Sequence, residues 1–427
     1  MALFVATMIA PGFFADASSE QTVVSTTAVS GVWVEPASGY DFLDAAISSA
    51  RSSIDLSMYE LSDPTIEREL VARAKAGANV RVVLNSAYDG TSENSAAASV
   101  LRAGSVHVAW APSSQIFHAK YLVIDDARAY IGTGNFVASD YSSTRDFWVE
   151  VGSRADVSAI EATFDSDFAG NGAAHQSSGL VWSPGSTGTL VNLITSARHS
   201  LLVENEEMDS PAIESALEGA AHRGVSVEVV MTQDPSWTSA LERLASAGVH
   251  VRLLNDEQIY IHAKVICADC TPSSGTVFIG SENFSISSLS YNRELGVVTT
   301  TLAAIRAVRS AVGSDFAIGT SLSGPSPSPP AGSSGSTVTI TSVIASIAHG
   351  NDEMLRAHTV PGKACTLTVV LPSGYTSEAS GLGADTADAS GTLTWNWWVS
   401  SDTDPGLAHA TVTCGSHTAA TTFTITS

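Results

Sequence analysis

The sequence predicts a duplicated α/β sandwich with pseudo-two-fold symmetry, followed by a small all-β sandwich. Two observations predict this fold class. A segment that begins at Ala50, ARSSIDLSMYELSDPTIERELVARAKAGANVRVVLN, aligns without gaps with one that begins at Ala197, 147 residues later. Beyond a Pro/Ser/Gly-rich stretch at 320–336, short Thr/Val-rich segments alternate with a period of two. Repetition predicts two copies of one structural unit, and period-two alternation predicts strands.

Each copy of the repeat predicts the same elements: a helix, an apolar strand, a helix that starts at a proline and ends at a glycine, and a second strand. Alternating helices and strands predict an α/β sandwich in each half, which we place at residues 36–175 and 180–319. The elements lie at 42–50, 54–58, 64–77 and 80–84 in the first half, and at 190–197, 201–203, 211–224 and 227–231 in the second.

The segment after the linker (320–336) predicts a β-sandwich over residues 337–427. Its strands are expected at TVTITSV, CTLTVVL, TLTWNWWV, ATVTC and TTFTIT. Cys365, a central tryptophan and Cys414 follow an immunoglobulin-like order. The tryptophan cluster is interpreted as core residues plus one exposed side chain. The alternative is a site for carbohydrate or for a membrane interface.

Four cysteines predict two disulfides in an exported chain, Cys267–Cys270 and Cys365–Cys414. The Cys-x-x-Cys spacing of the first pair is also compatible with a redox pair or with half of a metal site. A second Cys-x-x-Cys is missing from the sequence, which argues against the metal site.

The composition is that of a globular, acidic protein. Hydrophobic residues make up 44% of the 427 residues and charged residues 15%, which excludes a disordered chain. The formal net charge of −23 repels phosphate backbones at long range, and this disfavours a non-specific nucleic-acid binder.

The N-terminal segment MALFVATMIAPGFFADASSE indicates export. An apolar run precedes Ala15-Asp16-Ala17, which fits a small-x-small cleavage site. We therefore expect a signal peptide over residues 1–17 and a secreted protein. The alternative is a buried N-terminal helix. No other segment has about 20 uninterrupted apolar residues.

A polar pattern occurs once in each half. The first copy, FHAKYLVIDDARAYIGTGNF, begins at Phe117, and the second, IHAKVICADCTPSSGTVFIGSENF, begins at Ile261. A duplicated scaffold retained only for packing does not explain why His, Lys, Asp and Asn recur in register. We therefore interpret both copies as parts of an active site.

Within each copy, the histidine and the lysine lie two residues apart, so both project from the same face of one strand. Pseudo-two-fold symmetry brings His118 opposite His262, and Lys120 opposite Lys264, around one cleft. Two histidines can divide a two-step displacement between a nucleophile and an acid/base. Two lysines can neutralise the charge on a transferring phosphoryl group.

H-x-K-x(4)-D followed by G-[ST]-x-N, present twice, resembles the signature of the phospholipase D superfamily. The resemblance covers about residues 38–318. It implies phosphodiester exchange through a covalent phosphohistidine, and it favours His118 as the nucleophile and His262 as the acid/base. The motif residues that it marks as catalytic are His118, Lys120, Asp125, His262, Lys264 and Asp269.

The resemblance also marks Thr133, Asn135, Ser281 and Asn283 as substrate-binding residues. Asp146 and Glu294 match the downstream acidic position of the family, and each is expected to hydrogen-bond an imidazole N–H. Asp125 and Asp269 are expected to hold the backbone or lysine geometry rather than to contact substrate. No metal or other cofactor is expected, because two lysines supply the charge.

The expected substrate is phospholipid at a membrane or vesicle surface, with hydrolysis of the head-group phosphodiester and possible transfer to an alcohol. A metal-independent endonuclease is the first alternative, since the superfamily includes nucleases. An adhesion or binding protein with a relic core is the second. Because both motifs lie in one chain, a monomer suffices for the site, and no obligate protein partner is expected.

Overall fold

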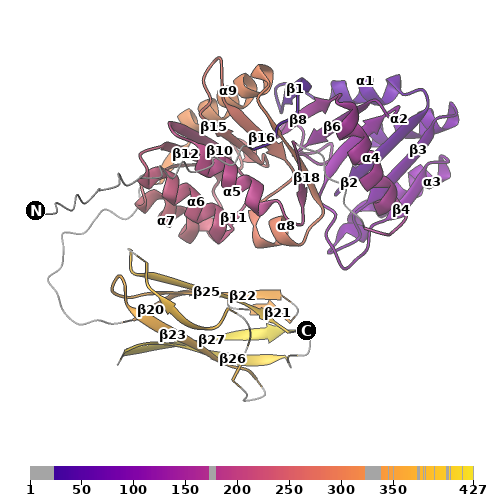
Figure 1. Ribbon diagram of the computed structural model, residues 1–427. Coiled ribbons are helices and arrows are strands. Elements are labelled where there is room, and N and C mark those ends of the chain that lie inside the picture. Colours follow the sequence, from indigo (N-terminus) through magenta and orange to yellow (C-terminus); the bar gives the residue numbers. More distant parts are fainter. Residues whose placement is uncertain are drawn as a thin grey trace, which may run out of the picture. The chain divides into compact units, whose positions relative to one another are not determined.

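The computed structural model describes residues 24–172, 179–322 and 338–426, the last range with short gaps. The chain forms two compact units, Met1–Pro327 and Ser328–Ser427 (Figure 1). The predicted signal peptide (1–17) and most of the predicted linker (320–336) lie outside the described residues.

The first half of the larger unit is built on a sheet with the strand order β1-β8-β6-β5-β2-β3-β4 (Figure 1). β3 runs parallel to β2 and β4, whereas β5 is antiparallel to β2 and β6. The elements are β1 (Val29–Val34), α1 (Asp41–Ser49), β2 (Ser53–Met58), α2 (Pro64–Lys75), β3 (Asn79–Leu84), α3 (Gly90–Ala103), β4 (His107–Trp110), β5 (Lys120–Ile124), β6 (Arg128–Gly132), β8 (Phe147–Val151) and α4 (Arg154–Phe168).

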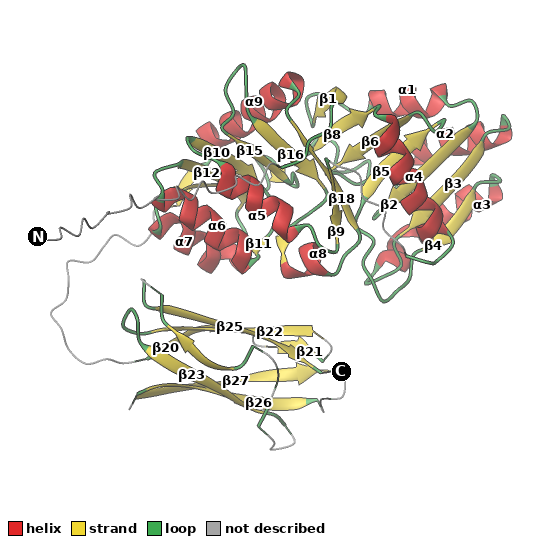
Figure 2. Ribbon diagram, viewed as in Figure 1, coloured by secondary structure: helices red, strands yellow, loops and turns green. Residues whose placement is uncertain are grey.

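The second half repeats this plan in a sheet with the order β19-β13-β12-β10-β15-β16-β18-β9. Helices lie against the sheets of both halves (Figure 2). The elements are β9 (Leu180–Ser183), α5 (Thr187–Ser196), β10 (Ser200–Glu204), α6 (Pro211–His222), β12 (Ser226–Thr232), α7 (Thr238–Ser246), β13 (His250–Leu254), β15 (Val265–Ala268), β16 (Thr276–Gly280), α8 (Ile286–Ser290), β18 (Glu294–Thr299), α9 (Leu302–Ile318) and β19 (Thr320–Leu322).

The predicted helices and strands of both halves are confirmed, with small shifts at their ends. α2 begins at Pro64 because Asp63 accepts a hydrogen bond from the backbone amide of Thr65 at 2.7 Å, and proline needs no donor in the first turn. The chain leaves the helix at Gly77, whose φ of +99° is one that a side chain rarely adopts. The predicted duplicated α/β sandwich is therefore confirmed.

The two sheets of the larger unit share one hydrophobic core. Successive side chains of β5 point to opposite faces, and both faces are buried. Tyr121 and Val123 belong to a cluster that also contains Val265 and Ile279 of the second half, together with residues of α4 and α9. Each half has a further cluster on its other face. The halves therefore pack as one body, which places their equivalent strand ends at a common centre.

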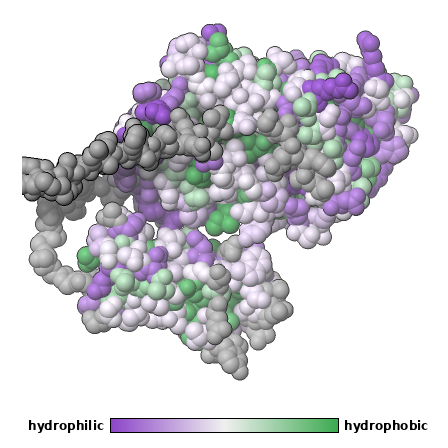
Figure 3. Space-filling model, viewed as in Figure 1, coloured by the Kyte–Doolittle hydropathy of each residue, from purple (hydrophilic) through white to green (hydrophobic). Residues whose placement is uncertain are grey.

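Hydrophilic residues gather over the outer helices of the first half, at the right of Figure 3. Among the described helices, none is both long and apolar enough to cross a membrane.

The smaller unit consists of two sheets, with strand orders β20-β22-β25 and β21-β27-β26-β23-β24. Side chains of both sheets share one core cluster, as in a β-sandwich. The sequence did not predict β21, β22 and β24. The strands are β20 (Thr339–Val343), β21 (Ser346–Ala348), β22 (Asn351–His358), β23 (Ala364–Val370), β24 (Gly383–Thr386), β25 (Thr392–Val399), β26 (Gly406–Cys414) and β27 (His417–Thr426).

Both expected disulfides are present, Cys267–Cys270 and Cys365–Cys414. The second one departs from the immunoglobulin arrangement, in which the disulfide joins the two sheets. Here it joins β23 and β26, which are paired neighbours in one sheet. The Cys-Trp-Cys order of the sequence therefore does not correspond to an immunoglobulin disulfide in this domain. Because both sulfurs of the first pair are bonded to each other, that pair is not half of a thiolate metal site.

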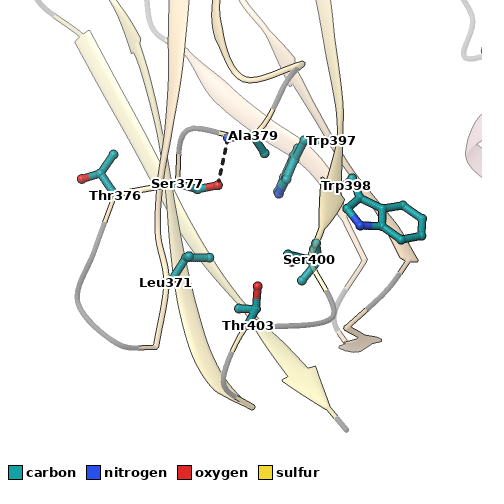
Figure 4. A pocket seen from close by; sticks show the side chains of 9 residues that line it. Leu371, Thr376, Ser377, Ala379, Trp397, Trp398, Ser400 and Thr403 are labelled. Atoms are coloured by element: carbon teal, nitrogen blue, oxygen red, sulfur yellow. Dashed lines mark hydrogen bonds between the residues drawn. The ribbon is translucent and has the colours of Figure 1, made fainter.

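The tryptophan cluster follows the interpretation as core plus one exposed ring. Trp395 and Trp397 are buried, whereas Trp398 is 46% exposed. Trp397 and Trp398 line a pocket of about 440 Å³ together with Leu371, Ser377 and neighbouring residues (Figure 4). Binding of carbohydrate or membrane by this region stays a prediction.

Candidate active site

Each His-x-Lys segment enters the centre of the larger unit beside a strand of its own half. Lys120 is the first residue of β5, and Lys264 directly precedes β15. His118 lies two residues before Lys120, and His262 follows the short strand β14 (Tyr260–Ile261). The side chains of both lysines are fully buried, and those of His118 and His262 are only 11% and 13% exposed. The sequence pattern is therefore brought together at one buried site.

The two halves exchange the partners of their histidines. His118 Nδ1 lies 2.9 Å from Glu294 Oε2, and His262 Nδ1 lies 2.9 Å from Asp146 Oδ1. Each imidazole is thus held by the acid of the other half. A carboxylate that accepts from Nδ1–H fixes the tautomer and leaves the Nε2 lone pair free. The expected pairing of imidazoles with Asp146 and Glu294 is confirmed.

Backbone pairing between the halves places these residues. The amides of His118 and Ala119 both donate to the carbonyl of Arg293, each at 2.9 Å. In the other half, β14 pairs in parallel with β7 (Thr144–Arg145). In each half, the residue before the histidine, Phe117 or Ile261, therefore pairs with the arginine that precedes the acid of the other half.

Two ion pairs tie the halves together behind the acids. Arg145 binds Asp315 through two hydrogen bonds, at 2.6 and 2.9 Å, and Arg293 binds Asp167 at 3.0 Å. Every one of these pairs joins the two halves, and the two arginines directly precede Asp146 and Glu294 in the sequence. The arginines therefore anchor the strands that carry both acids.

The two lysines have different surroundings. Lys264 Nζ donates to Glu206 Oε2 at 2.8 Å and to the carbonyl of His262. Lys120 Nζ is buried and has no hydrogen-bond partner among the described residues, and it lies 5.0 Å from the centroid of the Tyr59 ring. A buried ammonium without a partner is costly, so its position indicates that an anion binds there.

The motif asparagines are also incompletely paired. The side-chain oxygens of Asn135 and Asn283 are buried without a hydrogen-bond partner in the part of the chain that the structure describes. Polar groups in this state are rare in folded proteins and require an explanation. An amide oxygen is an acceptor, so these two atoms fit a hydrogen-bond donor of a ligand, whereas the ammonium of Lys120 fits an anion.

The motif aspartates lie elsewhere. Asp125 is five strand residues beyond Lys120, roughly 16 Å along an extended chain. Its carboxylate accepts from the amides of Arg51, Ser52 and Ser53, at 2.6–3.1 Å. Asp269 repeats this with the amides of three residues from Arg198. Both aspartates hold the backbone where the neighbouring strand begins, as expected, and the catalytic role that the motif marks for them is not borne out.

The motif hydroxyls also differ from expectation. Thr133 was expected to bind substrate, but its hydroxyl donates to Asp146 Oδ1 at 2.5 Å and accepts from the amide of Phe147. Ser281 accepts from the amide of Leu295 at 3.0 Å. Both side chains are fully buried. Their hydroxyls therefore hold Asp146 and the strands on either side of the acids.

The charges of the site are set by burial and by neighbouring ions. Burial lowers the pKa of His118 to about 4, and the positive charge of Lys120 adds to this. Burial and the nearby Lys264 lower the pKa of Lys120 to about 7. Burial raises the pKa of Glu294, but His118 and Lys120 outweigh it and hold that pKa below its usual range. At neutral pH, His118 is therefore neutral beside an ionised Glu294.

Sequence reasoning missed two residues of the site, Tyr59 and Glu206. They are 147 residues apart and so occupy equivalent positions of the repeat. Each follows the end of a strand, β2 or β10, beside its own His–Lys pair. Tyr59 lies 4.7 Å from the ring of His118, and Glu206 Oε2 lies 3.6 Å from His262 Nε2. The signal was their place after an apolar strand, where side chains meet the centre of an α/β fold.

A metal site is not evident from the described side chains, among which no group of three or more His, Cys, Asp or Glu could hold an ion.

Comparison with known proteins agrees with this fold. A family model described as "Cardiolipin synthase, PLD-like domain" matches residues 43–168 and 190–315, more than half of the chain. The chain therefore belongs to this family, whose domain is of the phospholipase D type. The family places the chain among proteins that act on phosphodiester bonds. A search of curated proteins gives no match.

Two solved structures have a similar fold. Polyphosphate kinase from Porphyromonas gingivalis is 17% identical with a TM-score of 0.56, and the match covers 69% of this chain and 48% of that one. The chain thus spans about half the length of that kinase. Phosphatidylserine synthase from Haemophilus influenzae is 12% identical with a TM-score of 0.54, covering 70% and 89%. At such low identity, both show the fold alone.

Proposed function

We propose that this chain is a secreted phosphodiesterase of the phospholipase D type, which hydrolyses the head-group phosphodiester bond of phospholipids through a phosphohistidine. One observation carries the proposal. Two imidazoles, each held at Nδ1 by a carboxylate of the other half, lie beside a buried lysine that has no partner among the described residues. This arrangement supplies a nucleophile, an acid/base and a binding site for an anion.

In the first step, His118 Nε2 attacks phosphorus and forms an N–P bond. The P–O bond to the head-group alcohol breaks, and His262, as imidazolium, gives its Nε2 proton to the leaving oxygen. In the second step, water attacks phosphorus and gives a proton to His262. The N–P bond then breaks, which releases the phosphate product and restores both histidines. An alcohol in place of water gives the transfer reaction by the same route.

The unequal surroundings of the two histidines support this division of roles. Burial keeps the pKa of His118 at about 4, so its Nε2 lone pair is available at neutral pH. Glu206 Oε2 lies 3.6 Å from Nε2 of His262, where it stabilises a positive charge on that ring. The neutral histidine is suited to attack, and the one beside the extra carboxylate is suited to give a proton.

Lys120 and Lys264 bind the oxygens of the phosphoryl group, and the amides of Asn135 and Asn283 add hydrogen bonds. Such preformed groups stabilise the charge that develops on phosphorus-bound oxygens. These cations take the place of a metal ion, so the proposed reaction needs neither metal nor other cofactor. The chain carries both motifs, so a monomer is sufficient.

Phospholipid is the proposed substrate class for two reasons. The description of the family names a phospholipid synthase, and the fold resembles that of a phosphatidylserine synthase. The net charge of −23 is unfavourable for holding a polyanionic backbone. A nuclease is therefore the outcome that the test must be able to reveal.

The test uses the purified full-length chain in EDTA. Phosphatidylcholine vesicles and single-stranded DNA are assayed in parallel with the wild type, His118→Ala and His222→Ala. His222 lies on the exposed side of α6 and serves as the matched control. Choline release that is lost in His118→Ala and kept in His222→Ala supports the proposal. DNA cleavage with intact vesicles makes the chain a nuclease, and loss of activity in EDTA that one added metal restores contradicts the metal-independent mechanism.

A further inference from the structure

The two halves place different residues at equivalent positions beside their His–Lys pairs. In the first half, the position holds Tyr59, whose ring contacts His118 and Lys120. In the second half, it holds Glu206, which contacts Lys264 and faces His262. The histidines, lysines and asparagines of the motif are the same in both halves, whereas this position holds an aromatic ring in one half and a carboxylate in the other.

Glu206 lies among the reacting groups. Its Oε2 accepts from Lys264 Nζ at 2.8 Å and lies 3.6 Å from His262 Nε2, while its Oε1 accepts from the hydroxyl of Tyr260 at 2.8 Å. Its side chain is 21% exposed, whereas Lys264 is fully buried, so it is open to solvent on one side. Burial raises its pKa, but Lys264 and His262 hold the pKa well below its usual range. Glu206 is therefore an ionised carboxylate in a site that otherwise fits an anion.

An ionised carboxylate beside a phosphate site disfavours most phosphodiesters. When a phosphate oxygen takes Lys264, Glu206 loses its partner and faces a second negative charge at short range. A substrate overcomes this only if it brings a cation of its own. This cation has to be on the leaving alcohol, because the proposed function places that alcohol beside His262 and therefore near Glu206.

We propose that Glu206 selects phosphodiesters whose leaving alcohol carries a positively charged amine, as in the zwitterionic head group of phosphatidylethanolamine. The inference rests on the proposed function. On binding, the Lys264–Glu206 ion pair is exchanged for two new pairs, Lys264 with phosphate and Glu206 with the ammonium group. A zwitterion satisfies both charges, whereas an uncharged or anionic head group leaves Glu206 unpaired.

Lys120 is not consumed by this exchange. Its ammonium has no acidic partner within the described residues, and it is available for the phosphate before the Lys264–Glu206 pair opens. Lys120 can therefore bind the phosphate of the ligand, and Glu206 can bind its ammonium group once Lys264 has turned to the phosphate. Tyr59, at the equivalent position of the first half, has no charge and cannot bind an ammonium group as a carboxylate does.

The experiment compares two soluble substrates that differ in head group only, dihexanoyl phosphatidylethanolamine and dihexanoyl phosphatidylglycerol. Both are used as monomers, so that the charge of a lipid surface plays no part. kcat/KM is measured for the wild type, Glu206→Gln and Glu207→Gln. Glu207 is the matched control, since its carboxylate hydrogen-bonds Ser285 and the charge of Lys264 acts on it more weakly than that bond.

We expect the wild type and Glu207→Gln to prefer the ethanolamine substrate by roughly tenfold or more, and Glu206→Gln to lose this preference. Equal turnover of both substrates by the wild type, or an unchanged ratio in Glu206→Gln, overturns the inference while the proposed function stands. Turnover of bis(p-nitrophenyl) phosphate but of neither lipid removes the phospholipid function itself and the inference with it.

A second measurement covers the case in which Glu206→Gln loses all turnover. Free ethanolamine and free glycerol are compared as inhibitors of wild-type turnover of bis(p-nitrophenyl) phosphate. Stronger inhibition by ethanolamine supports a cation site at Glu206, and equal inhibition by the two alcohols contradicts it.

Discussion

Glu294 and His118 are 176 residues apart in the sequence, yet a 2.9 Å hydrogen bond joins the imidazole Nδ1 to the carboxylate. The reciprocal bond joins His262 and Asp146 across 116 residues. Neither half holds its own histidine, so neither half alone has an ordered acid/base group. The duplication is thus required for the site and not only for the fold.

The first prediction concerns these acids. Asp146→Asn should lower kcat by about 10²–10⁴-fold with little change in KM, because a neutral amide no longer stabilises the imidazolium that His262 must become. The measurement is steady-state kinetics on a short-chain phospholipid. Glu242→Gln, on the exposed face of α7, is the control. A large rise in KM with kcat preserved would show that Asp146 serves binding and not proton transfer.

The second prediction tests which histidine carries the covalent bond. With a p-nitrophenyl leaving group, bond cleavage does not need the acid, whereas the release of the phosphohistidine needs a base. His262→Ala should therefore give a stoichiometric burst of p-nitrophenolate and a stable adduct. Peptide mapping of the quenched protein should place this adduct on His118. An adduct found in His118→Ala, on His262, would reverse the roles.

The third prediction is the pH dependence of kcat/KM, which reports groups of the free protein. His118 must be neutral to attack, so activity should fall as the pH drops through its pKa of about 4. Lys120 must be charged to bind phosphate, so activity should also fall as the pH rises through its pKa of about 7. Lys120→Arg should keep some activity and lose the upper limb, because arginine stays charged. An upper limb that persists in this variant would have to arise from another group.

Much of the fold and of the site could be predicted from the sequence, and the reasons are specific. The doubled His-x-Lys pattern predicted a shared site because the same polar residues recur in the same order in both halves. The order of helices and strands followed from Pro64, Gly77 and their counterparts. Such signals are local, so they do not need knowledge of the tertiary structure.

What the sequence did not reveal depends on contacts between distant residues. The sequence predicted a structural role for Asp125, but it left open whether the partner is a lysine or, as the structure shows, three backbone amides. The motif predicts that Thr133 binds phosphate, and only the structure shows that its hydroxyl binds Asp146. Glu206 lies outside the motif and acquires its meaning only through Lys264 and His262. The Cys365–Cys414 pair was predicted, but whether it joined two sheets or one depended on strand pairing.

The fourth prediction separates the structural role of the motif aspartates from catalysis. Asp125→Ala removes the acceptor of three backbone amides and should lower the free energy of unfolding by about 1–3 kcal/mol. The kcat of the folded protein should change little, because Asp125 is far from His118. Thermal unfolding and kinetics on the same sample provide the measurement. A kcat that falls as far as in His118→Ala would return Asp125 to the reacting groups.

The last prediction concerns the ion pair between Arg293 and Asp167, which joins the two halves with both side chains 2% exposed. Removing one partner leaves a buried charge alone, so Asp167→Ala should lower the free energy of unfolding by about 3–5 kcal/mol. The Arg293 carbonyl also accepts the amides of His118 and Ala119, so loosening this residue should displace the nucleophile and reduce kcat in the protein that remains folded.

A double-mutant cycle decides whether this coupling exists. Asp167→Leu combined with Arg293→Met replaces the ion pair by apolar groups, and it should recover much of the stability that either single change loses. Recovery of kcat together with stability would mean that the pair acts only as a clamp between the halves. Recovery of stability without kcat would show that Arg293 also sets the position of His118, so that the contact which joins the two repeats is also the one that orients the nucleophile.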